Sequence, residues 1–127
     1  MDRIEYTHRF LTSMGFTMII ETLVLFLVIR LIAKDWTIPA WRIVVAGLFA
    51  SFATIPYVWY VFPTVMDWPR NTSLLWSEPF IFLIEVCIYR FALGIRWRHA
   101  FFASLVCNLA SYLIGPFLRA NGLWIYW

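Results

Sequence analysis

The sequence contains little charge. Charged residues make up 13% of its 127 positions, whereas a soluble domain carries about twice that share, so the composition excludes an ordinary soluble protein. The chain also lacks the spacing of a zinc site, a nucleophile elbow and a phosphate-binding loop. We therefore expect no enzyme: no catalytic residue, no cofactor and no metal site.

Cysteine is scarce as well, with two residues in the chain, Cys87 and Cys107. Both lie within apolar runs and lack the Cys-x-x-Cys spacing of redox and metal sites, so we interpret them as small apolar core residues. Ten basic residues face seven acidic ones, but the basic residues are scattered at the ends of the apolar runs. This pattern is typical of the positive-inside rule and gives no indication of a nucleic-acid partner.

Hydrophobic residues, in contrast, make up 63% of the chain. A helix of about 20 residues spans a hydrocarbon core of about 30 Å, and four apolar runs reach that length: Ser13–Ile32, Ile43–Phe62, Pro79–Trp97 and Ala100–Leu118. Their short connections make successive helices antiparallel. The sequence thus predicts an all-α membrane protein, with residues 1–127 as a single transmembrane domain in the lipid bilayer, built from two helical hairpins.

The first apolar run does not read as a cleaved signal peptide. Glu21 lies inside it, the run spans a full bilayer, and no cleavage site of small residues follows. We expect this run to remain in the mature chain. The residues before it, Met1–Thr12, are interpreted as an interfacial segment with Tyr6 and Phe10 toward lipid.

The later boundaries follow from proline and from aromatic residues. Ser77-Glu78-Pro79 has the pattern of a helix start, with a capping residue and proline in the first turn. The segment after Pro116 ends in Trp124, Tyr126 and Trp127, and we interpret it as an aromatic tail along the membrane interface.

Small and hydroxyl-bearing residues form a stripe on the second helix. Gly47, Ser51 and Thr54 follow each other at i, i+4 and i+7 and share one face. Such a stripe allows two helix backbones to approach closely. Pro56 removes the donor that would reach the carbonyl of Phe52, which predicts a kink.

The two hairpins form an internal repeat. The second helices align at an offset of 57 residues, the distance from Gly47 to Ser104, so that Gly47, Ser51 and Thr54 fall on Ser104, Asn108 and Ser111. The first helices align Glu21 with Glu85 at a different offset. Two hairpins of one design in one chain predict a parallel repeat.

Glu21 and Glu85 are the residues that most need an explanation. Carboxyl groups in hydrocarbon are expensive, so each is expected to face protein and to have a partner. At 1.5 Å per residue, Glu21, Thr54, Glu85 and Ser111 all lie about 16–18 Å from the hairpin turns, so each Glu is predicted to meet a hydroxyl or amide of its own hairpin. The candidate ion, proton or polar-core residues are Glu85, Glu21, Asn108, Ser111, Ser51, Thr54 and Tyr89, the last of which shares a face with Glu85 at i+4.

Four stretches of the hairpins carry a resemblance: Ile20 to Val24, Ala50 to Trp59, Ile84 to Tyr89, and Ala103 to Ser111 with Gly115. From Glu21 to Gly115 the chain resembles a family of small, largely uncharacterised bacterial inner-membrane proteins. Those relatives often carry Asn-Leu-x-Thr-His-Pro in the second helix, where this chain has Ser51 and Ile55 in place of Asn and His. The resemblance implies the four-helix fold and the bacterial inner (plasma) membrane, and it implies no activity.

Three functional classes remain, and an intramembrane enzyme is the weakest of them because the chain lacks the catalytic motifs named above. The first is an ion- or proton-coupled transporter or channel component in which Glu21 and Glu85 titrate. The second is a non-catalytic structural or accessory subunit of a larger membrane complex. Four short helices hide two Glu-bearing faces only partly, so a homo-oligomer or a partner membrane subunit is expected to complete the burial.

The basic residues also predict an orientation. Six lie at the connections within the hairpins and four on the other side: Arg30, Lys34, Arg42, Arg90, Arg96 and Arg98 against Arg3, Arg9, Arg70 and Arg119. The positive-inside rule then places both termini outside the cytoplasm.

Overall fold

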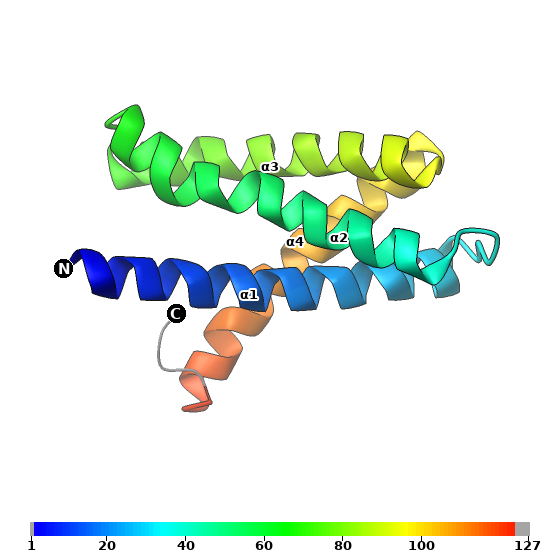
Figure 1. The fold of residues 1–127 in the computed structure, drawn as a ribbon, viewed down its shortest axis with the longest axis horizontal. Helices are drawn as coiled ribbons and strands as arrows, with labels where there is room; N and C mark the ends of the chain where they lie inside the picture. The colour runs from blue at the N-terminus through cyan, green and yellow to red at the C-terminus, as the bar shows by residue number, and fades with distance from the viewer. Residues whose placement is uncertain (1, 124–127) are drawn as a thin grey trace.

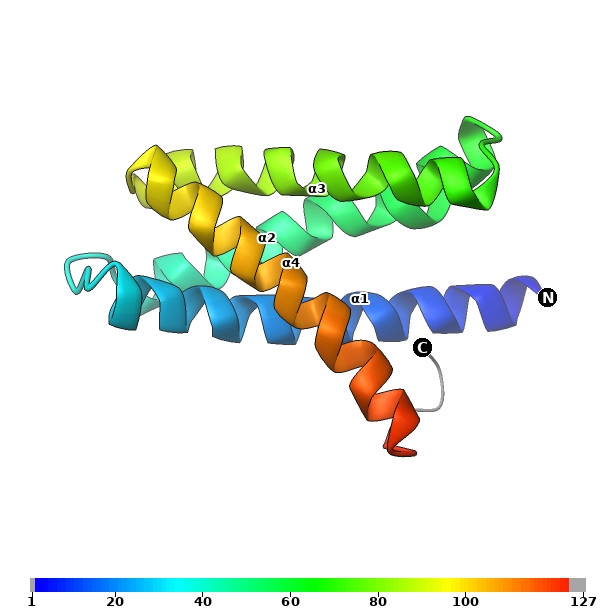
Figure 2. The same ribbon diagram turned by 180° about the vertical axis from the view of Figure 1, so that it is seen from behind.

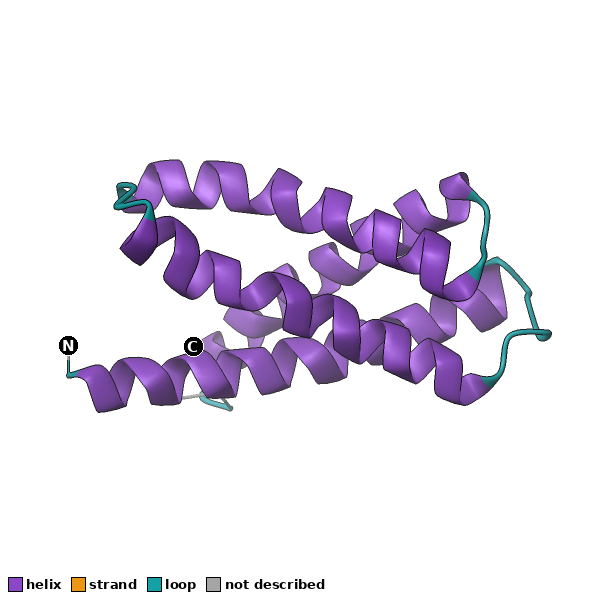
Figure 3. Cartoon of the chain, turned by 45° about the horizontal axis from the view of Figure 1, so that its top comes forward, coloured by secondary structure: helices purple, strands orange, loops and turns teal. Residues whose placement is uncertain are grey.

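The computed structural model describes residues 2–123, and within them every regular element is a helix (Figure 3). The elements are α1 (Arg3–Leu27), α2 (Ala40–Pro56), α3 (Arg70–Leu93) and α4 (Trp97–Ala120), and π-helical segments η1 (Val28–Ile32) and η2 (Tyr57–Val65) continue α1 and α2. The four continuous helical stretches are each long and apolar enough to cross a membrane. In length and composition these stretches match membrane-spanning helices.

The helices pack in a closed ring in which α1 contacts α2, α2 contacts α3, α3 contacts α4, and α4 returns to α1. The first three run antiparallel to their neighbours along the long axis of the molecule (Figure 1). Helix α4 does not follow that axis, and it crosses the bundle diagonally from the end of α3 toward and beyond α1 (Figure 2). Like the other helices of the ring, α4 contacts two neighbours, and these are α3 and α1.

The apolar core fills the half of the bundle that lies nearest the α1–α2 and α3–α4 connections. Leu25 and Ile29 from the first helix, Ile43 from the second and Tyr89 from the third are completely buried there. At the opposite half, aromatic rings replace aliphatic side chains, with Phe62 of η2 packed on Trp68 and Phe80. The two halves meet at the level of Glu21 and Glu85.

A left-handed residue ends each of the first three helical stretches. Lys34 and Asp67 both have φ of 51° and Gly94 has φ of 67°, a backbone shape that stops a helix. In the first connection the buried Arg30 guanidinium donates to the carbonyls of Asp35 at 2.7 Å and Ile38 at 2.8 Å. Thr37 donates to the Asp35 carboxyl from its hydroxyl and its backbone N–H, and these bonds lower the pKa of Asp35.

The predicted starts of two helices were wrong. Helix α1 begins at Arg3, ten residues before Ser13. Its first turns are polar, and a salt bridge between Glu5 and Arg9 at i, i+4 and 2.7 Å stabilises them without apolar side chains. Tyr6 and Phe10 are therefore helical, and they pack edge-on against Trp59 and Tyr60 of η2 where lipid contact was predicted.

Helix α3 begins at Arg70, directly after Pro69, and not at Ser77-Glu78-Pro79. The Ser77 hydroxyl donates to the carbonyl of Leu74 inside the helix, so it does not cap a helix start. Pro79 lies within the helix, as membrane helices tolerate. Helix α3 ends at Leu93 rather than at Trp97, because Gly94 turns the chain.

The other bounds differ less. Helix α2 begins at Ala40 and α4 at Trp97, each three residues before the predicted start. Helix α4 continues past Pro116 to Ala120, so the predicted tail starts later, and its Trp124, Tyr126 and Trp127 lie outside the described residues. At Pro56 the chain changes from α-helix to the π-helix η2, where a kink was predicted, because proline cannot donate to Phe52.

Gly47 lies at the closest approach of α1 and α2. A Cβ atom on Gly47 would lie 2.7 Å from Thr22 Oγ1 and 3.0 Å from Thr22 Cα. Both distances are shorter than van der Waals contact, so this position requires glycine. The structure confirms the close helix approach that the small-residue stripe predicted.

The cysteines occupy two different environments. Cys107 is completely buried in the core, as predicted, and its thiol donates to the backbone carbonyl of Glu21 at 3.4 Å. Cys87 is exposed on the outside of α3, so the core interpretation was wrong for it. Apolar runs in a membrane helix face lipid as well as protein, and an apolar neighbourhood in sequence does not separate the two.

Candidate functional site: a buried carboxyl pair

Two glutamate side chains meet in the centre of the bundle. Glu21 of α1 is 2% exposed and Glu85 of α3 is 0% exposed. One face of α4 supplies donors to both of them, Ser104 and Asn108 to Glu85 and Ser111 to Glu21, so the two carboxyl groups are close neighbours. Together they form a carboxyl pair, the name used below for Glu21 and Glu85.

Each oxygen of the Glu21 carboxyl group accepts one hydrogen bond from a hydroxyl group. Ser51 of α2 donates to Oε2 at 2.7 Å, and Ser111 of α4 donates to Oε1 at 3.0 Å. The Glu21 carboxyl therefore connects three helices. Ser51 belongs to the same hairpin, whereas Ser111 comes from the other one.

Glu85 is held differently, because both of its donors reach the same oxygen. Asn108 Nδ2 donates to Oε2 at 2.6 Å and Ser104 Oγ at 3.1 Å, both from α4. The second oxygen, Oε1, is buried and receives no hydrogen bond within residues 2–123. It is the one unsatisfied oxygen of the carboxyl pair in the described part of the chain.

One face of α4 serves both glutamates. Ser104, Asn108 and Ser111 occupy i, i+4 and i+7 on that face. The first two donate to Glu85 of α3, and Ser111, about one turn further on, donates to Glu21 of α1. Helix α4 packs against both α3 and α1, which brings the two glutamates to one helix face.

No basic side chain pairs with the carboxyl pair in the described residues. The Arg90 guanidinium lies over the Trp97 ring at 5.6 Å, and Arg42 Nε donates to the carbonyl of Ala92 at 2.6 Å. The salt bridge that the described chain contains joins Arg9 to Glu5, on the surface. Neutral hydroxyls and an amide therefore surround the two carboxyl groups, and within residues 2–123 no three His, Cys, Asp or Glu side chains gather as metal ligands.

The structure brings together five of the seven candidate residues: Glu21, Glu85, Ser51, Asn108 and Ser111. Thr54 is buried but does not reach a carboxyl group, because its hydroxyl donates to the backbone carbonyls of Ala50 and Ser51 at 2.9 and 3.4 Å. Tyr89 is buried in the core, and its hydroxyl has no hydrogen-bond partner within residues 2–123.

Ser104 is the donor that sequence reasoning missed, since it entered only as the repeat counterpart of Gly47. Its position four residues before Asn108 was the available signal, because i and i+4 share a helix face. The hydroxyl donates to Glu85 and also lies 3.1 Å from the carbonyl of Phe82. Ser104 and Asn108 thus act as one unit on Glu85.

Within this single chain both carboxyl groups are already covered. The predicted oligomer is therefore not needed for their burial, and it stays a prediction. No protein-family model, curated protein or solved structure matches this chain. Function is consequently argued from the chemistry of the carboxyl pair.

Proposed function

We propose that this protein is a proton- or cation-coupled transport component of a membrane, and that the carboxyl pair is the site that exchanges the ion. The observation that carries the proposal is that two buried carboxyl groups share the donors of one helix and have no basic partner in the described chain. Ionisable groups inside a membrane protein are costly and mark ion or proton pathways.

The geometry supports a shared proton. Two negative charges in contact repel strongly where water is excluded, so a carboxyl pair holds a proton or a cation between its members. Glu85 Oε1 is the oxygen without a donor, and a proton on Glu85 would remove the repulsion between the two groups. The serine and asparagine donors hold both groups in place while the shared ion is exchanged.

The same contacts favour a second candidate function, an accessory subunit in which the pair only fixes helix register. Donors from α2 and α4 converge on Glu21, and such a network locks helix positions whether or not an ion moves. The two functions differ in one respect: a locking network tolerates an amide in place of the carboxyl group, and an exchange site does not.

We also propose a bacterial inner-membrane location with both termini outside the cytoplasm. Six basic residues at the hairpin connections against four on the side of the termini support this orientation. Reporter fusions at the C-terminus test it, and a fusion active only in the cytoplasm would overturn it. A homo-oligomer or a partner membrane subunit remains our proposal for the assembled state, to be measured by mass in lipid nanodiscs.

The test of function is ion flux in liposomes that contain the purified protein. We compare the wild type with Glu21→Gln, Glu85→Gln and the double variant, and use the surface variant Glu5→Gln as the control. An amide keeps the shape and hydrogen bonds of the protonated acid but does not titrate. We expect proton flux to fall at least about tenfold in the double variant, with folding and oligomer size unchanged.

Two results would overturn the transport proposal. One is wild-type flux equal to that of empty liposomes under every imposed gradient tested. The other is full flux in the double Gln variant. Recovery of one stoichiometric partner protein from the source membrane, together with the first result, would instead establish the accessory subunit.

A further inference from the structure

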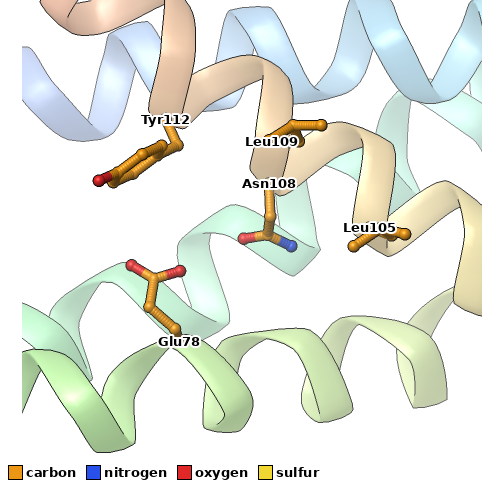
Figure 4. A pocket seen from close by; sticks show the side chains of 5 residues that line it. All are labelled: Glu78, Leu105, Asn108, Leu109 and Tyr112. Carbon is orange, nitrogen blue, oxygen red and sulfur yellow. The ribbon is translucent and has the colours of Figure 1, made fainter.

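A groove opens between α3 and α4 on the side of the carboxyl pair away from the apolar core. It encloses about 340 Å³ and is lined by Glu78 of α3 and by Leu105, Asn108, Leu109 and Tyr112 of α4 (Figure 4). The groove exists because α4 diverges from α3 along its diagonal course (Figure 2). Its volume lies at the lower end of the ~300–1,000 Å³ typical of small-molecule sites.

Two hydrogen-bond acceptors face this groove without a donor from the described chain. The Glu78 carboxylate points from α3 toward α4 (Figure 4), and it forms no salt bridge or hydrogen bond within residues 2–123. Asn108 uses Nδ2 for its hydrogen bonds to Glu85 and Ser104, so its Oδ1, on the Glu78 side of the amide, is left over (Figure 4). A carboxylate and an amide oxygen together favour a ligand that is positively charged and donates hydrogen bonds.

The remaining lining is apolar and aromatic. Leu105 and Leu109 offer two aliphatic side chains one turn apart on α4, and Tyr112 adds a ring. An alkyl or aryl group would pack against the leucines, and an ammonium group near the Tyr112 ring gains a cation–π contribution. The lining therefore matches a molecule with one cationic end and one apolar end.

We propose that the groove binds an organic cation, a protonated amine that carries an alkyl or aryl group. The ammonium would donate to the Glu78 carboxylate and to Asn108 Oδ1, while the apolar group lies on Leu105, Leu109 and Tyr112. This inference deepens the proposed function by naming the class of substrate. Binding of the amine stands on the groove alone, and only its transport across the membrane rests on the proposed function. Asn108 also donates to Glu85 at 2.6 Å, so the bound amine lies one side chain away from the carboxyl pair.

A free amine and the ammonium of a lipid headgroup share this chemistry. Glu78 lies eight residues after Arg70, the first residue of α3, which is about 12 Å along the helix axis, and directly before the apolar run that starts at Pro79. The position of Glu78 is within reach of both sources, and the binding test separates them.

The test uses 4-phenylbutylamine and its neutral counterpart 4-phenylbutanol, with the protein in nanodiscs of phosphatidylcholine and phosphatidylglycerol and empty nanodiscs subtracted. We expect saturable binding of the amine and none of the alcohol. Glu78→Gln should weaken amine binding at least tenfold, whereas the surface variant Glu5→Gln should leave it unchanged. The double variant of Glu21 and Glu85 to Gln should still bind the amine.

Three results would overturn the proposal: no saturable amine binding to the wild type, equal binding to Glu78→Gln, or loss of binding when phosphatidylethanolamine is added, which would identify a lipid headgroup as the occupant. Flux measurements on the same samples separate this inference from the proposed function. If the amine does not bind but proton flux still depends on Glu21 and Glu85, the amine site in the groove is rejected and the proposed function stands. If the amine binds but proton flux is the same in the wild type and in the double Gln variant, the carboxyl pair is rejected as the ion-exchange site.

Discussion

The two hairpins hold their buried glutamates in different ways. In the α1–α2 hairpin each oxygen of Glu21 has its own hydroxyl donor, one of them from the other hairpin. In the α3–α4 hairpin both donors of Glu85 belong to that hairpin and share one oxygen. Glu21 therefore joins the two halves of the bundle, whereas Glu85 has one oxygen, Oε1, without a donor in the described chain. Two identical side chains thus differ in how their oxygens are hydrogen-bonded.

The positions that align in the two second helices also differ. Gly47 brings the backbones of α1 and α2 together because it has no side chain, and its counterpart Ser104 uses a side chain to reach Glu85 and the carbonyl of Phe82. The first hairpin thus gains close packing at this position, and the second gains a donor. The following predictions test this difference, from the largest expected effect to the smallest.

Gly47→Ala should have the largest effect on stability. The added Cβ would lie 3.0 Å from the backbone Cα of Thr22, which cannot rotate away, so α1 and α2 must separate. We expect a loss of about 1–3 kcal/mol, as for other overpacked positions, measured by reversible unfolding in mixed micelles.

The control is Gly15→Ala on α1, where a Cβ would meet nothing within 4 Å. Alanine favours a helix over glycine by up to about 1 kcal/mol, so this variant should be neutral or slightly more stable. Equal destabilisation of the two variants would contradict the close approach at Gly47.

Asn108→Leu should have an intermediate effect. It removes the 2.6 Å donor of Glu85 and leaves Ser104 as the remaining donor. An interhelical hydrogen bond in a membrane protein is worth at most about 1–2 kcal/mol, and we expect a loss of that size. Tyr112→Phe, an exposed change on the same helix, is the control, and equal stability of Asn108→Leu and the wild type would show that Ser104 alone holds Glu85.

Much of this fold could be predicted from periodicity and length. The four apolar helices, the buried positions of Glu21 and Glu85, and the Ser51 and Asn108 contacts within their own hairpins follow from helix geometry and the cost of burying polar groups. The errors at Arg3 and Arg70 arose because the apolar pattern marks where a helix meets hydrocarbon, and the helix itself extends beyond that region.

The tilt of α4 was not predictable in the same way. Crossing angles depend on how side chains of two helices interlock, and small residues such as Ser104 and Ser111 permit several angles. The sequence therefore predicted the level of Ser111 along the helix correctly but paired it with the glutamate of its own hairpin, Glu85, whereas it donates to Glu21 of the other hairpin. The groove beside Glu78 was missed for the same reason, since it exists only where α4 leaves α3.

The smallest expected effect is that of Ser111→Ala. Its hydroxyl donates to Glu21 Oε1 at 3.0 Å and also lies 3.1 Å from the carbonyl of Asn108, so half of its bonding is within its own helix. Hydrogen bonds between membrane helices average about 0.6 kcal/mol, and we expect a loss near that value. A double-mutant cycle with Glu21→Gln then measures how strongly the two hairpins are joined. We expect coupling between Ser111 and Glu21 but none between Ser111 and Glu85, because Glu85 takes its donors from Ser104 and Asn108. Coupling of the same size to both glutamates would mean that the carboxyl pair acts as one unit and that the difference between the hairpins has no energetic consequence.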